Sequence, residues 1–382
     1  MKKIDAVTKI SDRLRQARRT SGLSTREVAQ RLQSMGVPAS HTTVAKYETG
    51  KSVSSLLMLD ALAAIYERSR EWFFNRGSSF GGVRYRALKS VRVVDKRRFE
   101  GESLGWFLAY FAAEKKVNDP VDCPKGFEIS ADESGARVAR QIRNYYKFQD
   151  LPIPSIVRLT ENFGIHVIQV ESEARIDGFS AMLGEVPVVV VNSKLSNDRI
   201  RMNVAHELSR HLFRNWVRGK ALRESEIEKR AMECASHLLI PDAALEAAFA
   251  LRSMIRLVQY KERYGISLAG MMFRARQSKL LDEGVYQRLR IEFRRLGWGK
   301  EEPGCVPPDR PTRMESLFEA AIQQRLLRLG EIAALAAADE RVVLQRLVLA
   351  KGGTIGSTHD TRPFNPLRID YVLLEQSDLK GS

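Results

Sequence analysis

Hydrophobic positions recur at helical spacing over residues 8–75 and predict a series of short helices. Gly22 and Gly50 fall where helices are expected to stop, because glycine tolerates the left-handed conformation at a helix C-terminus. Ser24 and Ser40 fall where the next helices are expected to start, and the glutamate three residues after Ser24 completes a capping box. An apolar run that reaches residue 74 predicts a fourth, longer helix that covers the first three.

The middle of the chain mixes helical patterns with short strand patterns. The β-branched run VPVVVVN at 186–192 is typical of a buried strand. Alternation at 165–170 and the turn DGFSAMLG predict two more strands. Helices are expected at about 103–117, 134–148, 197–218, 224–239, 242–260 and 266–296, and a helical pair is expected at 314–350. IDYVLL near the end is expected as a last strand. The predicted fold class is mainly α with a small β-sheet (α+β).

The amino-acid composition excludes several classes of protein but does not define the fold. Hydrophobic residues make up 44% and charged residues 28%, which is ordinary for a globular chain. No run approaches the ~18 apolar residues of a membrane span, and the first residues carry charges where a secretory signal would be apolar. The three cysteines lie far apart without a CxxC pair, which excludes a disulfide framework. We therefore expect a cytoplasmic protein.

Charge is more informative, because the formal net charge of +16 is concentrated in the first 150 residues. A basic excess at one end indicates nucleic acid or another polyanion as a partner there, and a surface selected for solubility is the alternative. Residues 84–98 hold seven basic residues against Asp95. This segment is interpreted either as a solvated linker or as a clamp on the DNA backbone.

A first motif lies in LSTREVAQRLQSMGVPASHTTVAKYETGK. Val28 and Leu32 fall on the core face of one helix, and the next helix ends in YETGK: an aromatic residue, Glu, any residue, Gly and a basic residue. With its flanking helices over about 9–74, this segment resembles the Cro/cI-type (XRE) helix-turn-helix domain, although the connection SMGVPAS is longer than the usual turn of that family. The resemblance implies binding to double-stranded DNA. We expect a homodimer, because one small module covers too little DNA for high specificity.

The residue types suit this chemistry. A recognition helix places short polar side chains at its N-terminal end, where they face base edges. The start of the preceding helix, and a lysine just after the recognition helix, can each hold a phosphate. The candidate DNA-binding residues are Thr25, Arg26, Ser40, His41, Thr42, Thr43, Lys46 and Lys51, with Val44 and Tyr47 on the buried side. The alternative is a four-helix module that binds protein.

A second set of motifs lies between residues 134 and 245. LPIPSIVRLTENFGIHVI, DGFSA, VPVVVVNSKLSNDRIRMNVAHEL and EKRAMECASHLLIP follow one another in the chain. In this order they resemble the ImmA/IrrE family of metallopeptidase-like proteins. The resemblance implies a zincin-like fold in which an HExxH helix supplies two metal-binding histidines and a catalytic glutamate. It also implies that a later glutamate, which matches Glu228, is the third ligand.

In this sequence the HExxH pattern is altered. Residues four apart differ by about 40° around a helix, so two histidines at that spacing face one metal, with the glutamate beside the open coordination position. His206 and Glu207 begin the pattern, but Arg210 occupies the i+4 position and His211 stands at i+5, roughly 140° away. A guanidinium is never a metal ligand, because it stays protonated.

Three interpretations of this site remain open. In the first, Arg210 replaces the positive charge of the metal and pairs with Glu207 and Glu228, so the site is degenerate. In the second, a distorted helix or π-bulge brings His211 inward, and His206, His211 and Glu228 hold zinc or manganese while Glu207 is catalytic. In the third, His206 and Glu228 bind metal weakly with another group.

The remaining histidines are not expected to join the metal site, and His166 is expected to be structural. His237 lies nine residues from Glu228, nearly opposite in phase on one helix, and is expected to be partly buried at the surface. His166 alternates with apolar strand residues, and His359 lies in a predicted loop.

The predicted organisation has five parts. They are a helix-turn-helix domain at 8–75, a basic linker and helical connection at 76–133, an ImmA/IrrE-like domain at 134–260, a helical C-terminal region at 261–350, and a loop and tail at 351–382.

The predicted function is that of a DNA-binding transcriptional regulator of stress, phage or mobile-element genes. Its middle domain is interpreted as a degenerate metallopeptidase-like sensor that binds a signal or a protein partner, such as a repressor or a toxin. The first alternative is an active metallo-endopeptidase that cleaves a repressor, with zinc or manganese as cofactor. The second alternative is the antitoxin of a toxin–antitoxin pair.

Overall fold

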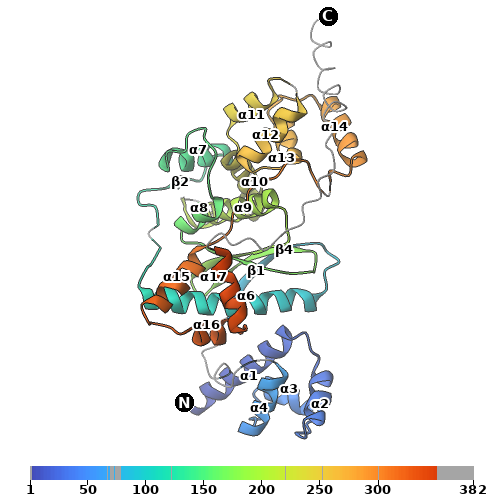
Figure 1. Ribbon diagram of the computed structural model, residues 1–382, viewed down its shortest axis with the longest axis vertical. Helices are drawn as coiled ribbons and strands as arrows, with labels where there is room; N and C mark the ends of the chain where they lie inside the picture. Colours follow the sequence, from blue (N-terminus) through green and yellow to red (C-terminus); the bar gives the residue numbers. More distant parts are fainter. Residues whose placement is uncertain are drawn as a thin grey trace, which may run out of the picture. The chain divides into compact units, whose positions relative to one another are not determined.

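The computed structural model describes residues 2–66, 68, 73, 79–121, 123–219, 221–251, 253–299 and 301–350. The fold is α+β, mainly helical with a small mixed sheet, as the hydrophobic pattern predicts (Figure 1). The chain divides into two compact units. The first unit comprises Met1–Val121, His166–Lys194 and Pro311–Ile355, and the second comprises Asp122–Ile165, Leu195–Arg310 and Gly356–Ser382.

The first unit begins with four short helices. They are α1 (Lys2–Thr20), α2 (Thr25–Ser34), α3 (His41–Glu48) and α4 (Leu56–Ile65). Their common core contains Leu14, Val28, Leu32, Val44 and Leu62, all nearly inaccessible to solvent. The predicted capping box of α2 is confirmed: the Ser24 hydroxyl accepts from the Glu27 N–H at 3.2 Å, and the Glu27 carboxylate accepts from the Ser24 N–H at 2.7 Å.

A four-stranded sheet forms the middle of the first unit. Its strands are β1 (Phe80–Ala87), β3 (His166–Val170), β4 (Ile176–Leu183) and β5 (Val186–Asn192), in the order β1-β4-β5-β3. β3 runs parallel to β5, and the other two pairs are antiparallel. Gly178 allows β4 to approach β5, because a Cβ there would lie 2.1 Å from the Val190 carbonyl oxygen.

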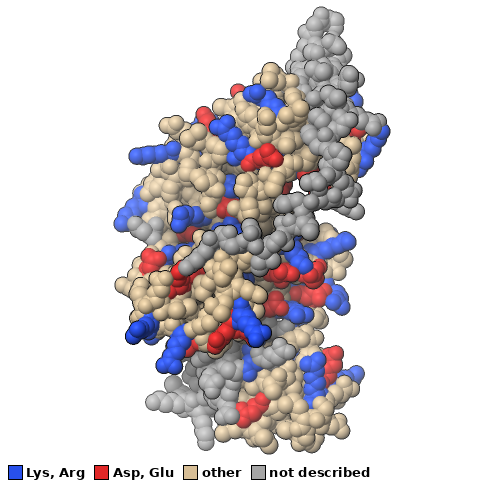
Figure 2. Space-filling model, in the orientation of Figure 1, with Lys and Arg blue, Asp and Glu red and all other residues tan. Residues whose placement is uncertain are grey.

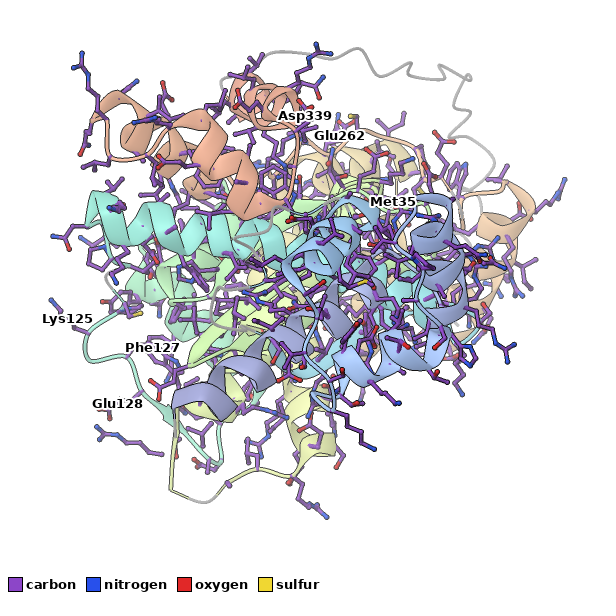
Figure 3. All side chains as sticks on the ribbon, turned by 90° about the horizontal axis from the view of Figure 1, so that it is seen from below. Met35, Lys125, Phe127, Glu128, Glu262 and Asp339 are labelled. Atoms are coloured by element: carbon purple, nitrogen blue, oxygen red, sulfur yellow. The ribbon has the colours of Figure 1, made fainter. Side chains whose placement is uncertain are left out.

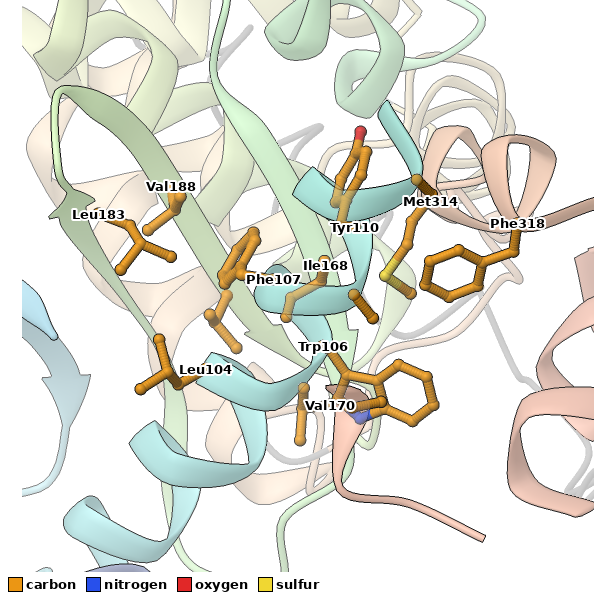
Figure 4. Close-up of a cluster of buried hydrophobic side chains, with 14 of the residues drawn as sticks. Leu104, Trp106, Phe107, Tyr110, Ile168, Val170, Leu183, Val188, Met314 and Phe318 are labelled. Atoms are coloured by element: carbon orange, nitrogen blue, oxygen red, sulfur yellow. The ribbon is translucent and has the colours of Figure 1, made fainter. Parts of the chain in front are cut away.

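Helices pack on this sheet to form the largest core of the first unit. They are α6 (Val93–Val117), α15 (Arg313–Gln323), α16 (Leu329–Ala336) and α17 (Glu340–Ala350). Figure 4 shows how Phe107 and Tyr110 of α6 meet Ile168 of the sheet and Phe318 of α15. Gly105 lets α6 and α16 come together, because a Cβ there would lie 2.3 Å from the Ala336 carbonyl oxygen.

The second unit is built from helices with one small parallel strand pair, β2 (Ile129–Ser130) and β6 (Val217–Arg218). Its helices are α7 (Gly135–Tyr145), α8 (Ile156–Asn162), α9 (Asn197–Asn215), α10 (Glu224–Leu239), α11 (Asp242–Phe249), α12 (Met254–Tyr264), α13 (Leu268–Gln277) and α14 (Glu283–Arg295). α9 packs along α10, and α7 packs on the other side of α10. The Gly135 N–H donates to Glu233 at 3.0 Å and fixes the start of α7 on α10.

Several elements differ from those that the sequence predicted. The basic segment 84–98, interpreted from the sequence as a solvated linker or a clamp on the DNA backbone, contributes the end of β1 and the first turns of α6. The single helix expected at 242–260 is two helices, and the helical pair expected at 314–350 is three helices. The strand expected at IDYVLL and the loop that contains His359 lie outside the described residues.

The segment rich in proline and glycine before α15 is anchored on the second unit. Asp309 accepts from the Ser155 hydroxyl at 2.6 Å and from the Ile156 N–H at 2.7 Å, so it caps α8. The same carboxylate receives the Arg201 guanidinium at 2.6 Å, and both side chains are buried. Asp309 therefore joins α8 to α9. In the described ranges, we find no helix with the length and apolar character required to span a bilayer.

Candidate functional site

The start of α3 combines a cap with exposed polar side chains. Ser40 is the N-cap of α3, and its hydroxyl accepts from the Thr43 N–H at 3.1 Å. The same hydroxyl lies 2.7 Å from the Thr42 hydroxyl and 2.8 Å from the Thr43 hydroxyl. His41 and Lys46 are exposed on the same helix. Ser40 thus already has a structural role, whereas His41 and Lys46 project into solvent.

The other candidate DNA-binding residues lie at the ends of helices. Thr25 and Arg26 open α2, and Arg26 is exposed. Lys51 is exposed just beyond α3, after Gly50 in the left-handed conformation. The connection between α2 and α3 begins at Met35, which is 47% exposed and is labelled in Figure 3. These positions leave cationic side chains at the start of α2 and at the end of α3.

A buried ion pair holds α3 against α1. The Arg18 guanidinium donates to both carboxylate oxygens of Glu48, at 2.5 and 2.8 Å, and Arg15 donates to the Glu48 carbonyl at 2.6 Å. The hydrogen bond to Glu48 raises the pKa of Arg18 despite its burial. The hydrophobic pattern of the sequence did not predict this pair. The glutamate of YETGK was the available signal, because a carboxylate next to an apolar helix face needs a cation.

In the second unit, a group of charged side chains lies between α9 and α10. His206, Glu207 and Arg210 of α9 are all buried. Glu228 and Glu224 of α10 face them from a partly exposed position. We call His206, Glu207, Arg210 and Glu228 the Arg210 network.

Arg210 joins both carboxylates of this network. Its Nη1 lies 3.2 Å from Glu207 Oε2, and its Nε lies 3.1 Å from Glu228 Oε1. His206 Nε2 lies 3.3 Å from the other Glu228 oxygen, and His206 Nδ1 lies 3.4 Å from Glu207 Oε1. The hydrogen bond with His206, together with the charge of Arg210, lowers the pKa of Glu228. The guanidinium therefore connects two carboxylates, one on each of the two helices.

His211 does not join this network. α9 is a regular α-helix from Asn197 to Asn215, so position i+5 points away from His206. The Nδ1 of His211 lies 2.9 Å from the side-chain amide nitrogen of Asn215. Burial and the nearby Arg210 cation lower the pKa of His211 to about 4, so its ring is neutral at pH 7.

Each of these two regions matches a known protein family. Residues 160–276 match the IrrE N-terminal-like domain. Residues 10–72 match a helix-turn-helix domain. The chain thus combines regions similar to a helix-turn-helix domain and to an IrrE N-terminal-like domain, which confirms both resemblances seen in the sequence. Neither the curated proteins nor the solved structures give a significant match.

The side chains of the region similar to the IrrE N-terminal-like domain do not fit a bound metal ion. His206 and Glu228 are suitable donors, but the i+4 position is filled by the guanidinium of Arg210, which carries a permanent positive charge. Across the described part of the chain, no group of three or more His, Cys, Asp and Glu side chains is arranged to hold a metal. The donor set lacks a third ligand, and a cation already occupies the space between the carboxylates.

Two other histidines have local partners. His237 Nδ1 lies 3.3 Å from Asp242 and 3.1 Å from Arg274, and burial lowers the pKa of His237 to about 4. His166, in the first unit, lies 3.1 Å from both carboxylate oxygens of Glu114. Both contacts tie a strand or helix to its neighbour.

A pocket of about 320 Å³ opens where α9 ends and α10 begins. It is lined by Phe213, Arg214, Val217, Gly219, Ala221, Leu222, Glu224 and Ile227. Glu224 lines the pocket, and its Oε1 also lies 3.9 Å from Arg210 Nε. No pattern in the sequence indicated this pocket, because its wall comes from residues that differ in character and belong to two helices and a strand.

Proposed function

We propose that this protein is a DNA-binding transcriptional regulator of stress, phage or mobile-element genes. In this proposal the IrrE N-terminal-like domain binds a signal or a protein partner and does not act as a metallopeptidase. The absence of metallopeptidase action is inferred from the position of Arg210, which bridges Glu207 and Glu228. DNA-binding regulation is supported by the helix-turn-helix match and by the basic N-terminal region.

Charge explains why Arg210 and a metal exclude each other. Two carboxylates held close together are costly unless a cation joins them. Arg210 is that cation in the structure. A divalent metal between His206 and Glu228 would lie next to the guanidinium, and the repulsion between two cations is strong in a buried site. The domain therefore holds its helices together by an ion-pair network at the place where the metal would bind.

On DNA, the proposal assigns base contacts to the exposed start of α3. His41, Thr42 and Lys46 would face base edges, while Arg26 and Lys51 would contact phosphates. One module of this size covers too little duplex for high affinity, so a dimer on a two-fold site is proposed.

Metal analysis of the purified full chain tests the site. We expect substoichiometric zinc or manganese and no peptidase activity for the unmodified protein. Arg210→His restores the i, i+4 histidine pair with His206 and is expected to raise the occupancy towards one metal per chain. Arg214→His is the matched control, because it adds a histidine one turn later on the same helix without completing the pair. The control should leave the metal content unchanged.

The competing function is an active metallo-endopeptidase, which is favoured by one observation. His206, Glu207 and Glu228 still lie together, with His206 Nε2 3.3 Å from Glu228. Near-stoichiometric metal in the unmodified protein, lost on His211→Ala, would contradict the degenerate site and establish this alternative. Equal metal contents in Arg210→His and Arg214→His would show that the i, i+4 geometry is not what limits binding.

A further inference from the structure

The first turn of α6 lies beside the expected phosphate-contacting end of the helix-turn-helix domain. Gly22, in the turn between α1 and α2, has a φ of 70°, and a Cβ on it would lie 3.3 Å from Val94 Cγ1. Two residues later Ser24 caps α2, and Arg26 is exposed in its first turn. The start of α6 therefore adjoins the N-terminus of α2, where backbone N–H groups favour a phosphate.

Helices α1 and α6 pack against each other at this junction, and each carries an exposed arginine. Arg19, in the last turn of α1, and Arg97, on α6, are both exposed. Burial lowers the pKa of Arg19, and the neighbouring positive charges lower it further, that of Arg97 most. Among the described residues, neither Arg19 nor Arg97 forms an ion pair. The Glu100 carboxylate interacts electrostatically with both arginines, and it accepts a hydrogen bond from the Tyr85 hydroxyl.

The neighbouring cations of α6 are balanced. Arg92 donates to Asp95 at 2.9 Å, and Arg98 donates to Glu102 at 3.2 Å. Basic and acidic side chains are also interspersed over the face of the molecule drawn in Figure 2. Arginines on neighbouring helices that form no ion pair repel each other, and a bound anion reduces that repulsion. The turn before α6 adds Lys89, which is exposed and likewise lacks an ion pair in the described ranges.

We propose that Arg19, Lys89 and Arg97 bind the phosphodiester backbone of duplex DNA next to the helix-turn-helix domain. The DNA contact then extends beyond residues 10–72 onto the start of α6. This inference rests on the proposed DNA-binding function. It assigns the charge of segment 84–98 to the backbone and not to base edges, so it adds affinity without adding sequence preference.

The experiment measures binding of the full chain to a 30-base-pair duplex of mixed sequence at several salt concentrations. Each phosphate contact contributes about 0.9 to the slope of log affinity against log salt. The double variant Lys89→Ala/Arg97→Ala should flatten the slope by about two and lower the affinity about tenfold or more at 0.1 M salt. Lys115→Ala/Lys116→Ala is the matched control, because it removes the same charge from exposed positions at the far end of α6. That end lies about 28 Å from Arg97 along the helix.

The outcomes separate this inference from the function on which it rests. A flattened slope for the first double variant, with the control unchanged, supports the backbone contact. Equal slopes for the unmodified protein and both variants overturn it and leave the helix-turn-helix domain as the whole contact. No salt-dependent binding by the unmodified protein overturns both proposals. The unfolding midpoint of Arg97→Ala should not fall, because the substitution removes a repulsion, so lost binding cannot be ascribed to unfolding.

Discussion

Two charged regions of this protein differ in whether their arginines are paired with carboxylates. At the junction of α1, α2 and α6, Arg19, Arg26 and Arg97 lie exposed, and Arg19 and Arg97 have no carboxylate partner among the described residues. In the Arg210 network the cation is buried and contacts two carboxylates of the same protein. Both regions are rich in arginine, but only the first leaves its positive charge available.

This difference in charge balance distinguishes a surface that can bind an anion from an ion-pair network that stabilises the fold. A site kept for an outside anion leaves its cations unbalanced in the free protein, at a cost in stability. A site whose charges are balanced internally has little left to offer a ligand. The Arg210 network lies where the family resemblance implied a metal site, and its contacts form an ion-pair connection between α9 and α10.

The largest effect is expected from Arg210→Ala. This substitution leaves Glu207 buried without its cation and should lower the free energy of unfolding by about 3 kcal/mol, the low end for a broken buried pair. The loss stays at the low end because the Glu228 side chain is 45% exposed. Urea denaturation followed by circular dichroism measures it.

Two controls sharpen this prediction. Arg214→Ala removes a partly exposed arginine paired with Glu224 and should cost less than about 1 kcal/mol. Adding Glu207→Gln to Arg210→Ala should recover part of the loss, because the uncompensated charge is gone. Equal losses for Arg210→Ala and Arg214→Ala would show that the network does not hold the helices.

The next effect concerns base recognition by α3. His41→Ala should weaken binding to the preferred sequence by about 1–3 kcal/mol, while binding to unrelated duplexes stays nearly unchanged. The preferred sequence can be selected from a random duplex library with the unmodified full chain. If His41→Ala lowers both affinities alike, His41 contacts the backbone and not a base.

Ser40 can separate the stability of α3 from its DNA contact. Ser40→Ala removes the N-cap bond to Thr43 and should lower stability by about 1 kcal/mol. Ser40→Asp keeps a capping oxygen and stability, but it places a negative charge at the helix end that is proposed to face the anionic duplex. It should therefore weaken DNA binding while the unfolding midpoint is retained. Unchanged DNA binding by Ser40→Asp would place this helix end away from the duplex.

The smallest effect is expected from Lys51→Ala. Lys51 is exposed, so the unfolding free energy should change by less than about 0.5 kcal/mol. The salt dependence of DNA binding should lose about one phosphate contact, a decrease of ~0.9 in slope. An unchanged slope would remove Lys51 from the contact surface.

Local signals in the sequence predicted much of the fold. Caps at Ser24 and Ser40 and the run VPVVVVN gave the start of α2, the start of α3 and the strand β5, because each depends on neighbouring residues. β1 was missed, since two glycines and two arginines hide its alternation. The three helices after residue 312 were taken as a pair, because their turns pass through left-handed Arg325 and Ala337, which carry no turn signal.

The candidate site was predictable only as far as helical phase and charge extend. The pairing of Arg210 with Glu207 and Glu228 follows from the spacing on α9 and the need of two carboxylates for a cation. The contact of His211 with Asn215, the pair of Arg18 with Glu48 and the pocket at the end of α9 depend on side-chain rotamers and on which helices meet. Such contacts are set by tertiary packing, which a single sequence does not display.

The interleaving of the two units has a consequence for synthesis of the chain. The core of the helix-turn-helix domain is complete once Phe73 has left the ribosome, whereas Val343, a core residue of the sheet unit, follows roughly 270 residues later. At 5–20 residues per second this is a delay of about 15–50 s. During that time the nascent chain carries a finished helix-turn-helix domain ahead of a sheet whose apolar face has no α15 or α16 to cover it. Termination before α15 would release such a chain, with the apolar face of its sheet exposed to proteases and chaperones.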